Sequence, residues 1–421
     1  MKKFGILVLL LSSLACGDEV YTVDELILKA LENSPDLKIS LAQVKTSKSR
    51  IDIANSSYLP LIDLHLNGGK NGQDSVSDTL IAGNLSLKQI IYDFGRTGAN
   101  VDSFKYDSES FTMLNLQDIS DKKRDVKFTY YDVLKALALI KVHKANIKLN
   151  ESQLYRSKKY FEAGIRTKID ISDAQVELIK SKLDLKKAQY DLQLAYASLD
   201  RAVCFKDEQS QYSVYNEDLD FQNLYSSLSD YKLNLNDSIN YAYENRYELK
   251  KYMADIKIAK AKNTLAYSEY YPEIYLNADY TKQRADKFKN YIPEDKWQTS
   301  LNLDWNIYQG GATTASTQEK RIQIDIAHAE LQNSKLSIKK ITTEAYINVY
   351  KAKDTVELSQ SLVKVSNEKF DQASKRYEYG LSDYIELQQS RQGYIDSLAS
   401  LVVNYYNYYQ AVAYLDNAIG K

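Results

Sequence analysis

Glycine is almost absent from the middle of this chain, and that scarcity limits the folds it can adopt. Between Gly98 and Gly310 the only glycine is Gly164, and the 421 residues include four prolines. A span of more than two hundred residues with one strong turn signal predicts long helices. Gly164 and Gly380 each end a long run without glycine or proline, so we expect the helices to reverse direction there.

The two reversals belong to an internal duplication. Gly164 matches Gly380 at an offset of 216 residues, whereas the segments before Pro60 and Pro272 match at an offset of 212. Such a duplication predicts two repeats with one order of elements: helix, β-hairpin, long helix and helix. The expected segments are a signal peptide at 1–17, repeat 1 at 18–204 with its hairpin at 58–92, a connector at 205–234, and repeat 2 at 235–421 with its hairpin at 270–308.

A proline closes the first helix of each repeat, because proline lacks a backbone donor and disfavours helix in the preceding residue. We expect continuous helices over 24–56 and 236–269, which end before Pro60 and Pro272. The later helices carry apolar residues every seven positions, for example from Val133 to Phe161, which is typical of a coiled-coil seam. The long helix of repeat 1 is expected to have about 65 residues, or about 100 Å, which matches two shorter helices stacked end to end. This length match predicts a rod with both reversals at the tip far from the strands.

Apolar and polar residues alternate beyond each proline, most clearly from Trp297 to Ile307. Alternation predicts strands with one apolar and one wet face, joined by polar loops around 68–78 and 282–296. A half-buried soluble sheet would show the same pattern. No other apolar segment is free to cover that face, however, and the aromatics Trp297 and Trp305 suit a lipid interface, which favours an outer-membrane barrel. Because open strand edges cannot face lipid and four strands cannot close a barrel, several chains must contribute strands.

The N-terminus is typical of a secretory signal, since Lys2 and Lys3 precede an apolar run and then small residues. Cleavage after Gly17 and cleavage before Cys16 with lipidation of that cysteine are both open. Elsewhere the charges nearly balance, at 55 basic against 56 acidic residues, so nothing favours nucleic acid. The three histidines lie in no metal or catalytic spacing. The sequence therefore predicts neither an enzyme nor a cofactor.

Acidic residues that follow the reversals are the best candidates for a functional site. They are Asp170 and Asp173 in repeat 1, and Asp383 and Glu386 in repeat 2. Acids at a helix N-terminus are ordinarily explained by the helix dipole. In a symmetric assembly, however, one inward acid becomes a ring of carboxylates, and such rings select cations or gate pores. Both explanations remain open from the residues.

The chain resembles the TolC family of outer-membrane efflux proteins over nearly its whole mature length. The resemblance rests on the duplicated unit with its paired hairpins, the Tyr-x-Pro sequences at Tyr58 and Tyr270, the glycines that follow Tyr308, and the two glycine reversals. The fold it implies is mainly α with a small β part: hairpins in an oligomeric transmembrane β-barrel, continued by a helical tunnel through the periplasm.

The resemblance also implies partners and site residues. It implies a homotrimer in the outer membrane of a Gram-negative bacterium, opened as a passive conduit by a periplasmic adaptor and an inner-membrane pump. The adaptor would dock at Gly164–Ile165 and Gly380–Leu381, and the pore-entrance acids of the family align with Glu386 and Gln389. Because Gln389 is not acidic, a doubled acidic ring is in doubt. The competing class is a periplasmic coiled-coil adaptor or structural protein without a pore.

Overall fold

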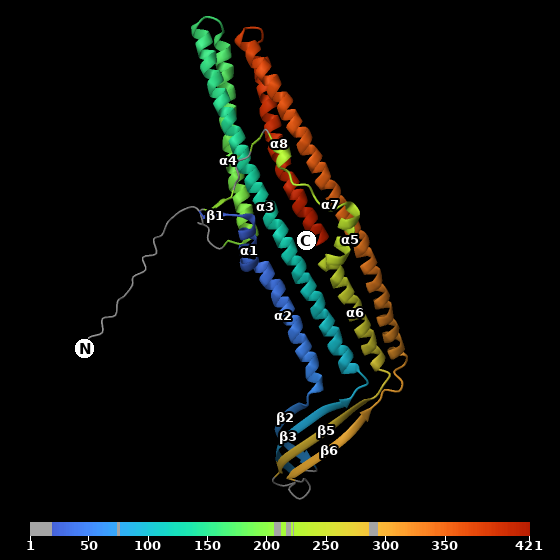
Figure 1. The fold of residues 1–421 in the computed structure, drawn as a ribbon. Helices are drawn as coiled ribbons and strands as arrows, with labels where there is room; N and C mark the ends of the chain where they lie inside the picture. Colours follow the sequence, from blue (N-terminus) through green and yellow to red (C-terminus); the bar gives the residue numbers. More distant parts are fainter. Residues whose placement is uncertain (1–18, 74–75, 206–211, 216–219, 222, 286–293) are drawn as a thin grey trace, which may run out of the picture. The chain divides into compact units, whose positions relative to one another are not determined.

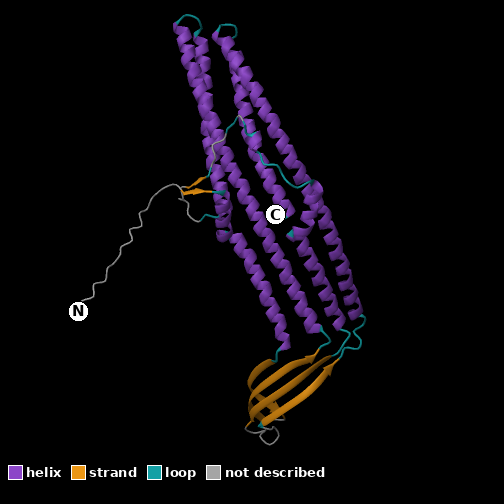
Figure 2. Ribbon diagram, viewed as in Figure 1, coloured by secondary structure: helices purple, strands orange, loops and turns teal. Residues whose placement is uncertain are grey.

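The computed structural model of the protein describes residues 19–73, 76–205, 212–215, 220–221, 223–285 and 294–421. The predicted signal peptide and Cys16 therefore lie outside the described residues. The protein is mainly helical with two β-hairpins, as predicted (Figures 1 and 2). The elements are β1 (Glu19–Tyr21), α1 (Val23–Asn33), α2 (Pro35–Asn55), η1 (Ser56–Tyr58), β2 (Leu61–Gln73), β3 (Val76–Tyr92), α3 (Arg96–Glu162), α4 (Lys168–Val203), β4 (Tyr212–Val214), η2 (Tyr225–Ser227), α5 (Leu235–Asn245), α6 (Tyr247–Ser268), β5 (Glu273–Ala285), β6 (Asp295–Asp304), α7 (Ala312–Glu378) and α8 (Tyr384–Ile419).

Two compact units share these elements, and each unit draws on both halves of the chain. The reversal unit contains the residues up to Ser34 together with Asp121–Leu233 and Ala345–Asn417. The sheet unit contains Pro35–Ser120, Asn234–Glu344 and Ala418–Lys421. The helices α3 and α7 contribute residues to both units.

In the reversal unit, α3 and α4 form one antiparallel hairpin, and α7 and α8 form another (Figure 1). The predicted seven-residue seams supply much of the core, since Val133 and Ile140 of α3 and Val349 and Val356 of α7 are buried. Phe161, the last residue of the α3 seam, is exposed. The seam therefore packs along the hairpin and ends before the reversal.

The connector also belongs to the reversal unit and contains a strand that the sequence did not predict. Strand β4 pairs in parallel with β1, with Glu19 opposite Tyr212 and Tyr21 opposite Val214. The ring of Tyr21 lies 5.8 Å from that of Tyr212, and the Lys29 ammonium lies 4.2 Å from the Tyr21 ring centroid. Aromatic and cation–π contacts of this kind help to hold the short pair of strands on the helices.

In the sheet unit, the two hairpins join into one antiparallel sheet with the strand order β2-β3-β5-β6 (Figure 2). Residues in register across the sheet share a face, and one such row is Leu64, Leu85, Tyr280 and Trp297. The next row, on the opposite face, is Asp63, Ser86, Asp279 and Gln298. The predicted division into an apolar and a polar face is therefore present.

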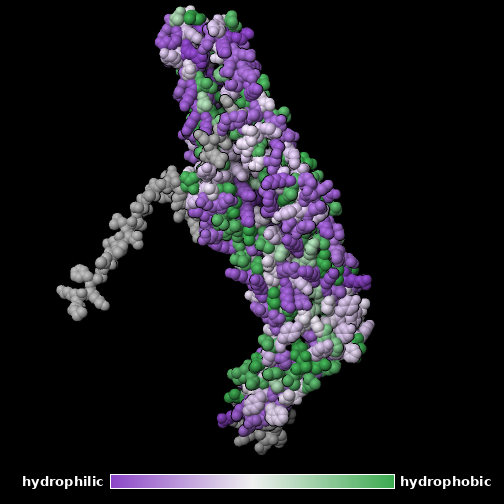
Figure 3. Space-filling model, in the orientation of Figure 1, coloured by the Kyte–Doolittle hydropathy of each residue, from purple (hydrophilic) through white to green (hydrophobic). Residues whose placement is uncertain are grey.

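The apolar face of the sheet is not covered by the described residues. The side chains of Leu64 and Trp297 are 64% and 78% exposed, and hydrophobic residues gather over the strands on the side shown in Figure 3. The outer strands β2 and β6 each pair on one side only within the described chain. A sheet with bare edges and a bare apolar face requires a partner or a non-aqueous surrounding.

The predicted continuous first helices are wrong in both repeats. Pro35 separates α1 from α2, because the residue before proline is forced out of the helical region, and Ser34 accordingly has ψ 119°. Arg246, which matches Ser34 at the offset of 212, separates α5 from α6 with φ −62° and ψ 125°. The break is therefore duplicated although its proline is not.

The predicted loop at 68–78 is also wrong, because β2 and β3 remain paired out to Gln73 and Val76. Backbone pairing needs no apolar side chain, so a polar stretch can continue a strand. In the second hairpin, β5 ends at Ala285 and β6 begins at Asp295; residues 286–293 lie outside the described residues. Strand β6 ends at Asp304, so Trp305 follows the strand that was expected to contain it.

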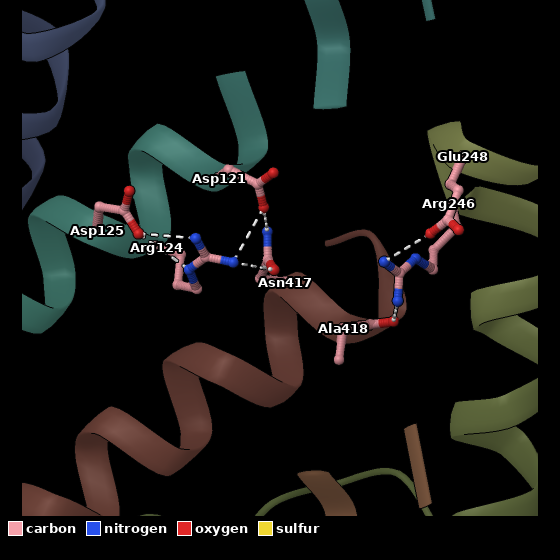
Figure 4. Close-up of polar contacts among 7 residues, drawn as sticks. All are labelled: Asp121, Arg124, Asp125, Arg246, Glu248, Asn417 and Ala418. Atoms are coloured by element: carbon pink, nitrogen blue, oxygen red, sulfur yellow. Dashed lines mark hydrogen bonds and ion pairs between the residues drawn. The ribbon is translucent and has the colours of Figure 1, made fainter. Parts of the chain in front are cut away.

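One arginine in each unit binds a residue in the last turn of α8 (Figure 4). In the reversal unit, Arg124 Nη1 donates to the side-chain oxygen of Asn417 at 3.1 Å and pairs with Asp121 at 3.1 Å. In the sheet unit, the buried Arg246 donates to the carbonyl oxygen of Ala418 at 3.2 Å. A cation at the last carbonyls of a helix is favoured by the helix dipole.

Candidate functional site

The first reversal is a glycine-dependent helix end that leaves an apolar side chain in solvent. Gly164 has φ +71°, and its amide donates to the carbonyl of Phe161 at 2.9 Å. The amide of Ile165 donates to the carbonyl of Tyr160 at 2.8 Å. These two bonds form a Schellman motif, which glycine favours because it adopts a left-handed backbone without strain. Ile165 is 64% exposed, as a docking residue must be.

The second reversal repeats this geometry. Gly380 has φ +74°, and its amide donates to the carbonyl of Tyr377 at 3.2 Å. The amide of Leu381 donates to the carbonyl of Arg376 at 2.8 Å. Leu381 is 70% exposed, and the neighbouring Tyr379 is 78% exposed. The two predicted docking segments thus present the same backbone shape and similar apolar side chains.

Alanine at Gly164 is expected to destabilise the reversal unit by about 1 kcal/mol, because alanine adopts a left-handed backbone only with strain. A Cβ atom at Gly164 would meet no heavy atom within 4 Å, so backbone strain is the only cost. Guanidinium titration of the helical circular dichroism signal measures the loss. Gly164→Asn should lose less stability than Gly164→Ala, since asparagine tolerates the left-handed conformation better. An equal loss of stability in both variants would contradict this explanation.

The acids after the reversals lie at the starts of α4 and α8. At the offset of 216, Asp170 matches Glu386, and Asp383 matches Thr167. In α4, the Asp170 carboxylate accepts hydrogen bonds from the Thr167 amide and hydroxyl, both at 2.9 Å, and completes a capping box. In α8, the Asp383 carboxylate accepts a hydrogen bond from the amide of Glu386 at 2.9 Å. Asp170 and Asp383 therefore each cap their own helix.

The other acidic candidates have different surroundings. Glu386 matches Asp170 in the duplication but forms an ion pair with Arg376 of α7, at 3.3 Å, and remains 44% exposed. Gln389 is exposed and Asp173 is half-buried. The structure thus places all five candidates within the first two turns of α4 and α8 or, for Asp383, directly before α8.

A small core joins the two hairpins next to the reversals. It consists of Ala174 of α4, Tyr377 of α7, and Tyr384 and Leu387 of α8, all buried. Burial is the main cause that raises the pKa of the Tyr377 hydroxyl, and the negative charge of Asp170 adds to it. The tyrosines therefore serve this core as neutral packing groups.

Arg166 is a site residue that sequence reasoning missed. It lies two positions after Gly164, yet its Nη2 donates to two carbonyls of the second reversal, those of Tyr377 at 3.2 Å and Ser382 at 3.1 Å. Its guanidinium carbon also lies 4.5 Å from the Tyr377 ring centroid, which adds a cation–π contact. The sequence gave little indication of these contacts, because the acceptors are backbone atoms more than two hundred residues away.

A buried ion pair between α4 and α8 was missed as well. Arg391 Nη2 lies 3.8 Å from Glu177 Oε2, and the two side chains are only 3% and 9% exposed. Glu177 also accepts a hydrogen bond from Lys180 at 2.7 Å. The sequence contained an indication of this pair, because Arg391 falls on the same helical face as the apolar Leu387 and Leu398. An unpaired charge on a buried face would be costly.

The two tryptophans predicted to face lipid lie in the sheet unit, away from the reversals in sequence. Trp297 is on the apolar face of the sheet unit, and Trp305 beyond β6 is 52% exposed with its Nε1 donating to the carbonyl of Tyr270 at 3.1 Å. Among the described residues, no three histidine, cysteine, aspartate or glutamate side chains are grouped so as to hold a metal ion. No helix in the described part of the chain combines the length and apolarity needed to cross a membrane.

Comparison with known proteins gives matches that cover both repeats. The model of the family described as "Outer membrane efflux protein" matches residues 26–204 and 238–421. Outer membrane protein TolC of Escherichia coli (strain K12) is 30% identical over 175 residues, which are 41% of this chain and 35% of that protein. The match thus spans about a third of that relative's length.

Two solved structures share the fold at low sequence identity. CusC superposes with a TM-score of 0.84 and 15% identity, over 94% of this chain and 92% of CusC. The outer membrane protein VceC from Vibrio cholerae superposes with a TM-score of 0.79 and 14% identity, over 94% of this chain and 96% of VceC.

Proposed function

Because the chain belongs to the outer membrane efflux protein family, we propose that it is the outer-membrane exit duct of a tripartite efflux or type I secretion system. Membership agrees with the expectation that the chain is not an enzyme. The observation that carries the proposal is the match of the family across both repeats, together with the bare apolar face of the sheet. A passive duct needs only a pore and a docking site, and the proposed site uses the reversals for both docking and gating.

The proposed assembly is a homotrimer. Four strands per chain with unpaired outer edges on β2 and β6 support closure by other copies, and three chains with four strands each would give a barrel of twelve. Outer-membrane barrels require such closure because lipid offers no hydrogen bonds to strand edges. The exposed Trp297 and Trp305 are then proposed to lie at the lipid interface.

The proposed gate lies at the starts of α4 and α8, where Asp170, Asp173, Asp383, Glu386 and Gln389 lie. An adaptor is proposed to dock on the exposed apolar residues beside Gly164 and Gly380, and the helices near the reversals then move apart. The partner pump supplies the energy, and the chain conducts passively.

Membrane fractionation and conductance together test this function. The channel predicts a heat-modifiable oligomer in detergent extracts of the outer membrane, and the purified oligomer should conduct ions in planar bilayers. The competing function, an adaptor or structural protein without a pore, predicts a protein that is recovered from the periplasmic extract. Recovery there, or an outer-membrane oligomer that never conducts, would contradict the proposal.

Glu386→Ala is expected to reduce the block of single-channel current by multivalent cations several-fold, because a ring of carboxylates is lost from the pore. The matched control is Asp396→Ala, which removes an exposed acid ten residues further along α8. Planar bilayer recordings at several cation concentrations measure the block. If both variants are blocked like the unmodified channel, Glu386 does not line the entrance.

A further inference from the structure

A cavity of about 720 Å³ lies in the reversal unit, where residues of the connector, α3, α7 and α8 line it. Its volume is within the range of about 300–1,000 Å³ that is typical of small-molecule sites. We call it the connector cavity, and its lining includes Phe221, Gln360, Glu368, Tyr394 and Leu398. All of these residues belong to the reversal unit, so the cavity lies within one compact unit.

One part of the lining is apolar and aromatic. The aliphatic side chains of Val363 and Leu398 are only 6% and 8% exposed. The ring of Tyr394 is stacked on that of Phe370, with the ring centroids 5.9 Å apart and the planes inclined by 8°. This stacking holds the Tyr394 ring in place beside the cavity. Such a lining favours a ligand with an aromatic or branched aliphatic body.

The amide of Gln360 places a buried acceptor in the lining. Its Nε2 donates to the backbone carbonyl of Phe221 at 3.2 Å. Its other polar atom, Oε1, is buried and has no hydrogen-bond partner among the described residues. A buried acceptor without a donor costs free energy. A ligand that donates a hydrogen bond to Gln360 Oε1 would remove that cost.

The charges in the lining favour a cation. Asp220 of the connector and Glu368 of α7 contribute two carboxylates, and Lys364 contributes one ammonium. Two negative charges and one positive charge attract a cation more than an anion. The buried acceptor and the carboxylates therefore suit a donor group that carries a positive charge.

The first repeat does not reproduce this lining. At the offset of 216, Gln360 matches Lys144 and Leu398 matches Lys182, and both lysines are exposed. The first repeat thus has two cations at the positions where the second has an acceptor and an apolar side chain. The lining is a property of the second repeat alone and does not follow from the duplicated helix packing.

We propose that the connector cavity binds an amphipathic amine, in which a protonated amino group is attached to an aromatic or branched aliphatic body. The amino group donates to Gln360 Oε1 and is attracted by the carboxylates of Asp220 and Glu368. The apolar body lies against Tyr394 and Leu398. This inference goes beyond the proposed channel function and does not depend on it.

Isothermal titration calorimetry of the purified protein in detergent tests the site, with dansylcadaverine as the probe. Dansylcadaverine has an aromatic body and a primary ammonium group, whereas dansylamide has the same body without the ammonium. Heats measured with detergent alone are subtracted. The unmodified protein should bind dansylcadaverine saturably and dansylamide about tenfold or more weakly, since the charged hydrogen bond is missing. Equal affinities for the two probes, or no saturable binding of dansylcadaverine, would overturn the proposal.

Gln360→Leu should weaken the binding of dansylcadaverine about tenfold or more, because the acceptor for the charged donor is lost. The matched control is Gln372→Leu, which replaces an exposed glutamine of α7 that does not line the cavity. This control should bind dansylcadaverine like the unmodified protein. An equal loss of affinity in the two variants would contradict the role of Gln360.

The two charged residues of α7 should change the affinity in opposite directions. Glu368→Gln removes an attractive carboxylate and should weaken binding about threefold, whereas Lys364→Gln removes a repulsive ammonium and should strengthen it about threefold. Added salt should reduce both effects. Asp354→Asn, which neutralises an exposed acid of α7 outside the cavity, should leave the affinity unchanged. If Glu368→Gln and Lys364→Gln shift the affinity in the same direction, the cavity does not recognise a cation.

Filling the cavity gives a further test. Leu398→Trp should abolish saturable binding of dansylcadaverine while circular dichroism shows that the helices remain. If this variant does not fold, the affinities of Gln360→Leu and Lys364→Gln decide. Planar bilayer recordings of the same unmodified protein report the channel function separately. A protein that conducts but does not bind dansylcadaverine contradicts this inference alone, and one that binds but does not conduct contradicts only the channel function.

Discussion

Replacing Glu177 with alanine is expected to lower the free energy of unfolding of the reversal unit by about 3 kcal/mol. The substitution leaves the guanidinium of Arg391, whose side chain is 3% exposed, in a buried site without its carboxylate partner. A buried charge that loses its partner keeps its desolvation cost and loses the compensating attraction. Far-ultraviolet circular dichroism during guanidinium titration, at fixed protein concentration, measures the loss of helix.

Two comparisons make this prediction specific to burial. Glu162→Ala removes an exposed ion pair with Lys159, whose side chains are 55% and 62% exposed, and should leave the titration midpoint unchanged. Glu177→Leu combined with Arg391→Met removes both buried charges and should lose less stability than the two single substitutions added together. If Glu177→Ala shifts the midpoint no more than Glu162→Ala, the buried pair does not stabilise the unit.

Gly420→Ala is expected to destabilise the sheet unit by about 2 kcal/mol, for two reasons that act together. Gly420 has φ +81°, where alanine is strained, and a Cβ atom would lie 3.1 Å from the backbone nitrogen of Arg246 and from the carbonyl carbon of Asn245. Backbone atoms at the α5–α6 break cannot turn aside as a side chain can. The same guanidinium titration reports the change.

The matched control for Gly420 is Gly393, which lies within α8, is exposed, and has open space where a Cβ would be added. Gly393→Ala should raise stability by about 0.5–1 kcal/mol, because alanine has a higher helix propensity. The expected result is that Gly420→Ala lowers the free energy of unfolding and Gly393→Ala raises it. If Gly420→Ala leaves the free energy of unfolding unchanged, the C-terminal turn does not pack on the α5–α6 break in solution.

The sequence predicted well the features that repeat along the chain. The scarcity of glycine predicted the long helices, and the seven-residue seam predicted the burial of Val133 and Val349, because the packing of a coiled coil follows local periodicity. Alternation likewise predicted the two faces of the sheet. The two matched glycines predicted where the helices reverse, and α3 and α7 end two residues before Gly164 and Gly380, which both have positive φ.

Features without a periodic signal were missed or misplaced. The break at Arg246 has no proline, and only the match to Ser34 and Pro35 at the offset of 212 could have revealed it. Strands β2 and β3 continue through polar residues because backbone hydrogen bonds need no side chain. The contacts of Arg166 were beyond sequence reasoning, since backbone carbonyls accept hydrogen bonds whatever their residue type.

The helices of the two repeats match in length almost residue for residue. Helices α3 and α7 both have 67 residues, and α4 and α8 both have 36. One residue deleted from a helix interior would turn everything beyond it by about 100° and shorten it by about 1.5 Å, so a seam or a reversal would no longer meet its neighbour. The four-residue difference between the repeats falls instead between Pro272 and Tyr308, around the second hairpin. Insertions and deletions among relatives should therefore collect in hairpin turns and in the connector, and helix lengths should change in both repeats together or not at all.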